Sequence, residues 1–148
     1  MGKIDVAKLK KRTGSGYPSP YDAPMAGRIR QRLGDAAGLT QFGVNLLVLE
    51  PGAWSSQRHW HEGEDEFLVM LSGEAVLIED EGETILRPGD CAAWPKGVAN
   101  GHHLVNRSDA DCVFIALSAG DDSRGSYSDI DMRWTPEGYV HKDGTPYA

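Results

Sequence analysis

The chain has 148 residues, of which 40% are hydrophobic and 25% charged, and its formal net charge is −7 at pH 7. This length suits one domain with one core, and the composition excludes a chain that is disordered throughout. The 18 glycines and 8 prolines predict many turns, which favours an all-β fold over a helical bundle.

Positive charge is concentrated at the start of the chain. Residues 1–32 hold eight of the fifteen Lys and Arg residues but only two acids, whereas the remainder holds twenty acids. A basic arm can bind nucleic acid, but about forty residues are few for a helix-turn-helix module with a linker. The acidic remainder also argues against a broad phosphate-binding face. We therefore expect a solubilising or docking arm and no nucleic-acid partner.

The arm leads into a series of short strands. Residues 13–24, TGSGYPSPYDAP, predict an extended surface segment, and 29–33 predict a short edge strand. Eight further strands follow, each closed by Gly, Pro or charge, and such close spacing predicts a sandwich or barrel. These strands are expected at residues 41–50, 55–61, 66–72, 74–80, 83–87, 90–94, 102–106 and 112–118. Helix is expected only as one or two turns within residues 3–11.

The tail, rich in Gly, Asp, Ser and Tyr, predicts ordered loop or a covering strap. We therefore divide the chain into an arm with an edge strand (1–40), a barrel (41–118) and a strap of the same domain (119–148).

Neither the cysteines nor the apolar runs indicate a secreted or membrane protein. Cys91 and Cys112 are the only cysteines, and two thiols make no disulfide framework. No run approaches the ~18 apolar residues of a membrane helix, and the first twelve residues lack the apolar core of a signal peptide. We expect a cytoplasmic protein without a membrane partner.

His59 and His61 are the first chemical signal. Residues i and i+2 of a strand share a face, so two imidazoles can converge on one cation. A carboxylate from the acids at 62–66 would add an oxygen ligand. A third histidine, His102 or His103, would come from a distant strand that meets the first at a barrel mouth.

The segment PGAWSSQRHWHEGEDEFLVMLSG resembles the first cupin motif, in which Gly, five residues, His-x-His, three or four residues, Glu, six residues and Gly follow one another. Here His59-Trp60-His61 is followed by four residues, Glu66, six residues and Gly73. In the second cupin motif, Gly, five residues, Pro-x-Gly, two residues, His, three residues and Asn follow one another. Gly89, Pro95 and Gly97 match its first part. The resemblance covers residues 41–118 and implies a double-stranded β-helix, the jelly-roll barrel, in agreement with the strand count.

The sequence departs from the family pattern at two places. Six residues, not five, separate Gly52 from His59, and Asn100 stands where the second motif has His. A two-residue insertion after Gly97 would place His102 there, because three residues then lead to Asn106 as the motif requires.

The resemblance implies a ligand set and a cofactor. The ligands are His59, His61, Glu66 and His102, with His103 and Asp65 as alternatives, whereas Glu62 and Glu64 are expected on a solvated turn. Such a set suits one divalent transition ion, Mn, Fe, Ni, Cu or Zn, with binding that weakens below pH ~6.5 as the histidines protonate. The residues that could line the pocket are Gln57, Leu68, Met70, Trp94, Leu104 and Asn106.

The resemblance also implies two functions and a homodimer. The first function is a metal-dependent enzyme, of dioxygenase, isomerase or lyase type, acting on a small oxygen-rich molecule. The alternative is a non-catalytic module that binds or senses a small ligand and regulates a partner. No catalytic residue beyond the metal ligands can be named, because fold alone does not fix function.

Overall fold

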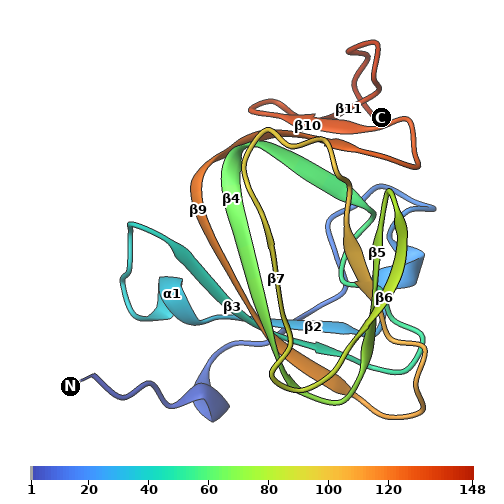
Figure 1. The fold of residues 1–148 in the computed structure, drawn as a ribbon. Coiled ribbons are helices and arrows are strands. Elements are labelled where there is room, and N and C mark those ends of the chain that lie inside the picture. The colour runs from blue at the N-terminus through green and yellow to red at the C-terminus, as the bar shows by residue number, and fades with distance from the viewer. Residues whose placement is uncertain (1) are drawn as a thin grey trace.

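The computed structural model describes residues 2–148, and strands dominate it (Figure 1). Within residues 2–148, helix is limited to the 3-10 turns Val6–Lys8 and Ala23–Met25 and to α1 (Leu33–Ala36). None of these helices is long and apolar enough to cross a membrane. The strands are β1 (Arg12–Thr13), β2 (Arg28–Arg32), β3 (Gly43–Leu49), β4 (His59–Ser72), β5 (Ala75–Glu79), β6 (Gly82–Leu86), β7 (Cys91–Trp94), β8 (His103–Val105), β9 (Cys112–Tyr127), β10 (Arg133–Thr135) and β11 (Gly138–Val140).

Two sheets face each other. The larger follows the order β1-β2-β3-β9-β10-β11, with β4 paired to both β9 and β7, and the smaller has the order β6-β5-β8. Figure 1 shows β4 and β9 side by side over their length, with β5 and β6 on the opposite side of the barrel. The expected all-β jelly roll is confirmed.

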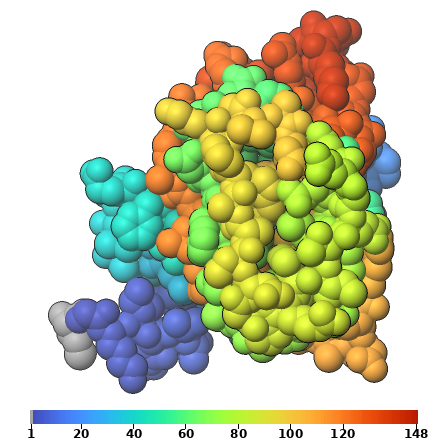
Figure 2. All heavy atoms as spheres, viewed as in Figure 1, coloured from blue at the N-terminus to red at the C-terminus, as the bar shows by residue number. Residues whose placement is uncertain are grey.

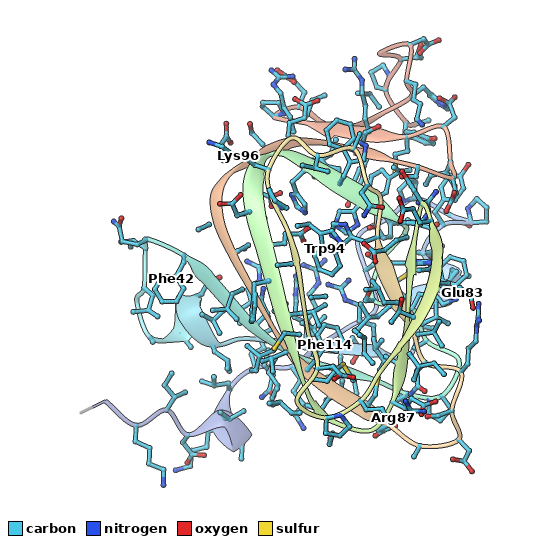
Figure 3. The ribbon with its side chains drawn as sticks, viewed as in Figure 1. Phe42, Glu83, Arg87, Trp94, Lys96 and Phe114 are labelled. Atoms are coloured by element: carbon cyan, nitrogen blue, oxygen red, sulfur yellow. The ribbon has the colours of Figure 1, made fainter. Side chains whose placement is uncertain are left out.

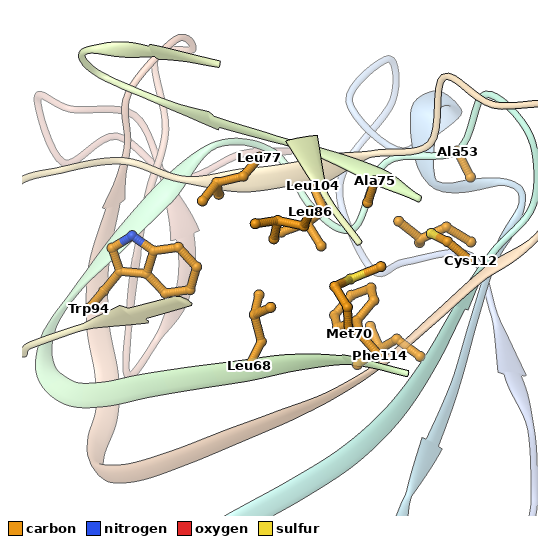
Figure 4. Close-up of a cluster of buried hydrophobic side chains, with 12 residues drawn as sticks. Ala53, Leu68, Met70, Ala75, Leu77, Leu86, Trp94, Leu104, Cys112 and Phe114 are labelled. Carbon is orange, nitrogen blue, oxygen red and sulfur yellow. The ribbon is translucent and has the colours of Figure 1, made fainter. Parts of the chain in front are cut away.

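The core lies between the sheets. Alternate residues of each strand point inward, so Leu68 and Met70 of β4 meet Leu77 of β5 and Leu104 of β8 (Figure 4). Figure 3 shows Trp94 and Phe114 inside the barrel at different heights, with charged side chains such as Glu83 and Arg87 outside. This apolar packing fills one half of the barrel and leaves the other half to polar side chains.

Strand β4 differs from the prediction. The acids at 62–65 indicated a turn between two strands, yet β4 runs unbroken for 14 residues. The reason is its partner: β9 continues past residue 118 and pairs Gly63 with Asp121 and Asp65 with Ala119. The backbones approach so closely that a Cβ on Gly120 would lie 2.3 Å from the Gly63 carbonyl oxygen. The turn signal therefore lost to long-range pairing, which satisfies the backbone of the whole segment.

The tail also holds more regular structure than a strap. The end of β9 pairs with β10, which pairs with β11, and these strands cover the upper end of the barrel in Figure 1. Figure 2 shows the red C-terminal residues packed onto that end and the first residues, in blue, standing out at the opposite corner. β9 crosses the boundary expected at residue 118, so barrel and tail share a strand.

Two large apolar side chains of β4 are exposed on the outer face of the larger sheet. Phe67 and Leu71 of β4 are 42% and 49% exposed, on the side opposite the core residues. Exposed apolar patches of this kind are typical of contact surfaces. The expected homodimer stays a prediction.

The indole of Trp134 depends on a glycine beneath it. A Cβ on Gly125 would lie 1.9 Å from Cη2 of Trp134, and the indole Nε1 donates to the Asp122 carbonyl oxygen at 2.9 Å. We expect Gly125→Ala to lower the free energy of unfolding by about 1–3 kcal/mol, because the indole must move. Urea unfolding followed by fluorescence measures the change.

The matched control is Ser126→Ala, one residue along β9, which should stay within about 0.5 kcal/mol of wild type. An unfolding midpoint of Gly125→Ala equal to that of the control would contradict the packing described.

Candidate metal centre

Three imidazoles surround one carboxylate at the polar end of the barrel. Nε2 of His61 lies 3.1 Å from Oε1 of Glu66, and Nε2 of His102 lies 2.5 Å from its Oε2. Nε2 of His59 lies 3.2 Å from Nε2 of His61 and 3.8 Å from Oε1 of Glu66. The four side chains named from the sequence are thus together, and all three histidines direct Nε2 towards the same carboxylate.

Two features of the strands produce this convergence. His59 and His61 share a face of β4 by strand alternation, but Glu66 is the fifth residue after His61, and strict alternation would place it on the opposite face. The pairing of β4 with β9 shifts register between His61 and Gly63, and the alternation changes phase there. His102 lies just before β8, and an isolated bridge between the two backbones holds it beside His59.

The other ring nitrogens hold the imidazoles in place. Nδ1 of His59 lies 2.8 Å from the Gln57 carbonyl oxygen, and Nδ1 of His102 lies 3.0 Å from that of Asn100. A carbonyl can only accept, so Nδ1 of each ring carries a proton, and in the neutral imidazole this leaves on Nε2 the lone pair that a metal requires. This arrangement of outer hydrogen bonds is typical of histidines that bind metals.

His61 differs because its Nδ1 faces acids. Asp122 of β9 places a carboxylate oxygen 2.8 Å from it, an ion-pair contact outside hydrogen-bond alignment, and Glu64 lies at 3.5 Å. Burial lowers the pKa of His61, but Asp122 and Glu66 outweigh burial and raise it to about 10. The imidazole therefore lies in a field of negative charge that favours a cation.

The two partly buried glutamates, Glu64 and Glu66, behave differently. Burial alone would raise the pKa of Glu66, but hydrogen bonds to His102, His59 and His61 hold it well below its usual range. Burial raises the pKa of Glu64 to about 7, and the nearby Asp122 charge adds to the shift. Glu64 is only 11% exposed, so its expected place on a solvated turn is wrong, while Glu62 is exposed as expected.

The donor atoms fit a divalent transition ion. Imidazole nitrogen with one carboxylate oxygen is a donor set that Mn, Fe, Ni, Cu and Zn accept. The ligand atoms of His59, His61 and Glu66 all lie within 4.8 Å of one another, and His102 joins them through its contact with Glu66. The alternatives face elsewhere: Asp65 is exposed and accepts from the Lys96 backbone N–H at 2.8 Å.

His103 also turns away from the cluster. Its Nδ1 lies 2.8 Å from the Ser56 carbonyl oxygen, and its ring packs edge-on against Trp54 with centroids 4.9 Å apart. The adjacent histidines of this segment thus have separate positions, His102 towards Glu66 and His103 towards the neighbouring loop.

Two adjoining cavities of about 480 and 240 Å³ open beside the cluster, and His59 and His61 line both. Of the expected lining residues, Leu68, Trp94 and Leu104 line the smaller one. Trp94 also stacks on His102, with centroids 3.7 Å apart and planes 5° from parallel.

The remaining expected lining residues have structural places. Met70 belongs to the apolar core. Gln57 is buried and its amide donates to the Tyr21 carbonyl oxygen at 2.8 Å. Asn106 is fully buried and its amide donates to the carbonyl oxygens of Leu49 and Ala110, each at 2.8 Å. These three residues are not among those that line the two cavities, because backbone groups or the core occupy their side chains.

Sequence reasoning missed the residues that the tail brings to the site. Trp134 of β10 packs against the rings of His59 and His61, with centroids 5.7 and 5.0 Å away. Tyr127, at the end of β9, is 5.9 Å from the His59 ring. No periodic pattern in residues 119–148 indicated these contacts, because they depend on pairing with β4.

It also missed the arginines of the arm. Arg12, Arg28, Arg30 and Arg32 line the larger cavity, so the arm is more than a solubilising or docking tail. The signal was present in the sequence: Arg28, Arg30 and Arg32 alternate along one strand and must share a face.

Comparisons with known proteins agree with this architecture. The family model of the cupin domain matches residues 45–118. A crystal structure from Silicibacter pomeroyi, named as a sugar phosphate isomerase from a cupin superfamily, is 46% identical with a TM-score of 0.91, covering 99% of this chain and 96% of that one. None of the curated proteins matches the chain.

Two further structures are more distant. A putative sugar phosphate isomerase from Acidithiobacillus ferrooxidans is 25% identical with a TM-score of 0.70, and the match covers 82% of this chain and 80% of that one. A polyketide cyclase from Streptomyces resistomycificus is 19% identical with a TM-score of 0.70 over 88% and 87% of the two chains, which shows the fold alone. With the family model, the 46% identity and the two-sheet barrel in agreement, this chain belongs to the cupin family.

Proposed function

We propose that this protein is a metal-dependent enzyme that isomerises a small molecule with oxygens on adjacent carbons. The observation that carries the proposal is the convergence of three Nε2 atoms on the Glu66 carboxylate beside a cavity. His59, His61, His102 and Glu66 would hold the ion. When bound, a divalent ion supplies Lewis-acid chemistry to oxygens that chelate it.

The chain's own residues would shape the reaction space. Trp134 and Tyr127 form an aromatic wall over His59, which limits the access of water to the ring face. The Glu64 carboxyl lines the smaller cavity, and it is not one of the four proposed ligands. A carboxyl group with a pKa near 7 is suited to taking up and returning a proton.

Isomerisation is favoured over the dioxygenase and lyase reactions by one comparison. The Silicibacter pomeroyi structure, 46% identical over nearly the whole of both chains, is named as an isomerase. The cavities, of about 480 and 240 Å³, have the size of a small-molecule site. A non-catalytic ligand-binding role is the other outcome that the experiments below would reveal.

Two adjacent histidines provide a matched test of the ligand set. Protein expressed in metal-replete medium should carry about one divalent ion per chain. His102→Ala should lose most of it, because it removes one nitrogen donor, whereas His103→Ala should keep it. Elemental analysis of both purified variants measures the difference, and circular dichroism checks their folding. Equal metal content in the two variants would exclude His102 as a ligand.

Asp122 allows a test of the outer contact. Asp122→Asn should weaken metal binding by about 10- to 100-fold, because it removes the charge facing Nδ1 of His61. The control is Asp121→Asn on the same strand, which should leave affinity unchanged since its carboxylate accepts from the Ser123 backbone N–H. Competition with a metal chelator of known affinity measures both values, and identical affinities would refute the contact's role.

Enzyme and binding module differ in turnover. We expect the metal-loaded protein to interconvert hydroxy-aldehydes and hydroxy-ketones, and His102→Ala to lose this activity. Proton NMR in deuterated water measures the conversion. Thermal stabilisation by such compounds without conversion would contradict the enzyme proposal and favour a binding role.

A further inference from the structure

The arm brings a row of arginines to the wall of the larger cavity, where Arg28 and Arg30 are partly buried and Arg12 and Arg32 are exposed. We call Arg12, Arg28, Arg30 and Arg32 the arginine face. In β2, Arg28 pairs with Leu49 of β3 and Arg30 with Leu47. Paired residues of neighbouring strands point to the same side of a sheet, and both leucines belong to the core. The guanidinium groups therefore share the side of the sheet that faces inward.

This face opens on the same space as the histidines. All four arginines line the cavity of about 480 Å³ together with His59 and His61, and Arg28 and Arg30 also line the smaller cavity. A molecule in this space can reach the arginine face and the histidine cluster at once.

The positive charge of the face is largely uncompensated by carboxylates of residues 2–148. Among residues 2–148, only Arg32 of the four has a carboxylate partner, Asp35 at 3.3 Å on the surface. The Nε atoms of Arg28 and Arg30 are buried without a hydrogen-bond partner in the same described part. Arg12 and Arg30 are direct cross-strand partners, which places like charges opposite each other.

This arrangement has an energetic cost. Burial lowers the pKa of Arg30 to about 10, and the neighbouring Arg28 and Arg32 add to the shift. Burial is also the main cause that lowers the pKa of Arg28. Arg28 keeps one hydrogen bond, from Nη1 to the Gly14 carbonyl oxygen at 3.4 Å. A partly buried guanidinium with an unpaired Nε and no carboxylate partner is nevertheless destabilising. Inward charges can protect an edge strand from aggregation, but β2 is paired on both sides, by β1 and β3.

We propose that the arginine face binds a phosphate group, and that the ligand of this cavity is a phosphomonoester whose other oxygens reach the histidine cluster. A phosphate dianion offers two charges and three terminal oxygens, which several guanidinium forks can share. A carboxylate carries one charge and two oxygens, too few for this cluster. The larger cavity also offers the polar side chains of Ser15, Tyr17 and Tyr139 and one acid, Asp122, which faces His61.

That the non-phosphate oxygens of the ligand reach the histidine cluster rests on the proposed function. Binding of the phosphate group to the arginine face does not require a metal. Metal-free protein therefore provides the test. We expect inorganic phosphate and glycerol 1-phosphate to bind by calorimetry and to raise the unfolding temperature, and glycerol and acetate to do neither at the same concentration.

Arg28→Gln and Arg30→Gln should each weaken phosphate binding by about tenfold or more, since each removes a charged fork. The control is Arg87→Gln, whose side chain lies outside the barrel (Figure 3) and pairs with Glu74 at the surface. It should bind phosphate as the wild type does.

A second measurement separates a binding role from a structural one. Without phosphate, Arg30→Gln should be at least as stable as wild type, because it removes a partly buried charge that has no carboxylate partner among residues 2–148 and whose Nε has no hydrogen-bond partner there. With phosphate, wild type should become the more stable protein. If these arginines served the fold alone, the variant would be less stable under both conditions.

Three results would overturn the proposal: no phosphate binding by wild type, wild-type affinity in both arginine variants, or acetate binding as tightly as phosphate. Metal content is measured on the same variants and should not change. Loss of metal in His102→Ala with intact phosphate binding supports both proposals separately. If the protein carries its full complement of metal but does not bind phosphate, only the proposal of a phosphate site is refuted.

Discussion

The antiparallel pairing of β4 with β9 is the constraint on which the rest of the molecule depends. The two strands stay together from Ser72 and Val113 at the core end to His59 and Tyr127 at the site end. At the core end their alternation directs apolar side chains inward. Beyond the irregular register after His61, the same strands present His61 and Asp122 to each other. One ladder of backbone hydrogen bonds thus positions both the apolar core and the polar cluster at the other end of the barrel.

Two opposite sets of charge then meet in one space. Glu66, Glu64 and Asp122 surround His61 with negative charge, which favours a cation. The arginine face lines the neighbouring wall and favours an anion. The two sets do not neutralise each other in direct ion pairs within residues 2–148. A ligand that brings an anionic group to the arginines and neutral oxygens to the cation site would satisfy both, which matches the proposed substrate class.

Local pattern was sufficient for some of these features. Alternation along a strand predicted that His59 and His61 share a face, and the motif spacing selected Glu66 and His102, which the structure brings together. Alternation also contained the arginine signal, but the arm's charge was interpreted as solvent-facing. That interpretation failed because the register of β2 with β3 turns these arginine side chains to the inner side of the sheet. Alternation in the sequence shows that the side chains share a face, but it does not show whether that face points inward or outward.

Other features depend on contacts between distant segments. The acids at 62–65 are a local turn signal, and only pairing with residues 119–121 turns them into strand and buries Glu64. Trp134 reaches the histidines because Gly125 leaves room for its indole. No local periodicity carries this information, since the partners are separated by many residues in the chain and meet only after the barrel has formed.

The proposed metal ligands and the other residues that line the cavities come from different parts of the chain. The four proposed metal ligands fall within residues 45–118, the part that matches the cupin domain. The arginine face lies before this part, whereas Trp134 and Tyr127 come after it. Metal-ligand geometry therefore belongs to the shared barrel, while the groups that would select a substrate come from the flanking segments. Barrels with the same histidines can then act on different molecules, because exchanging the arm changes the cavity wall without disturbing the β4–β9 ladder that holds the proposed ligands.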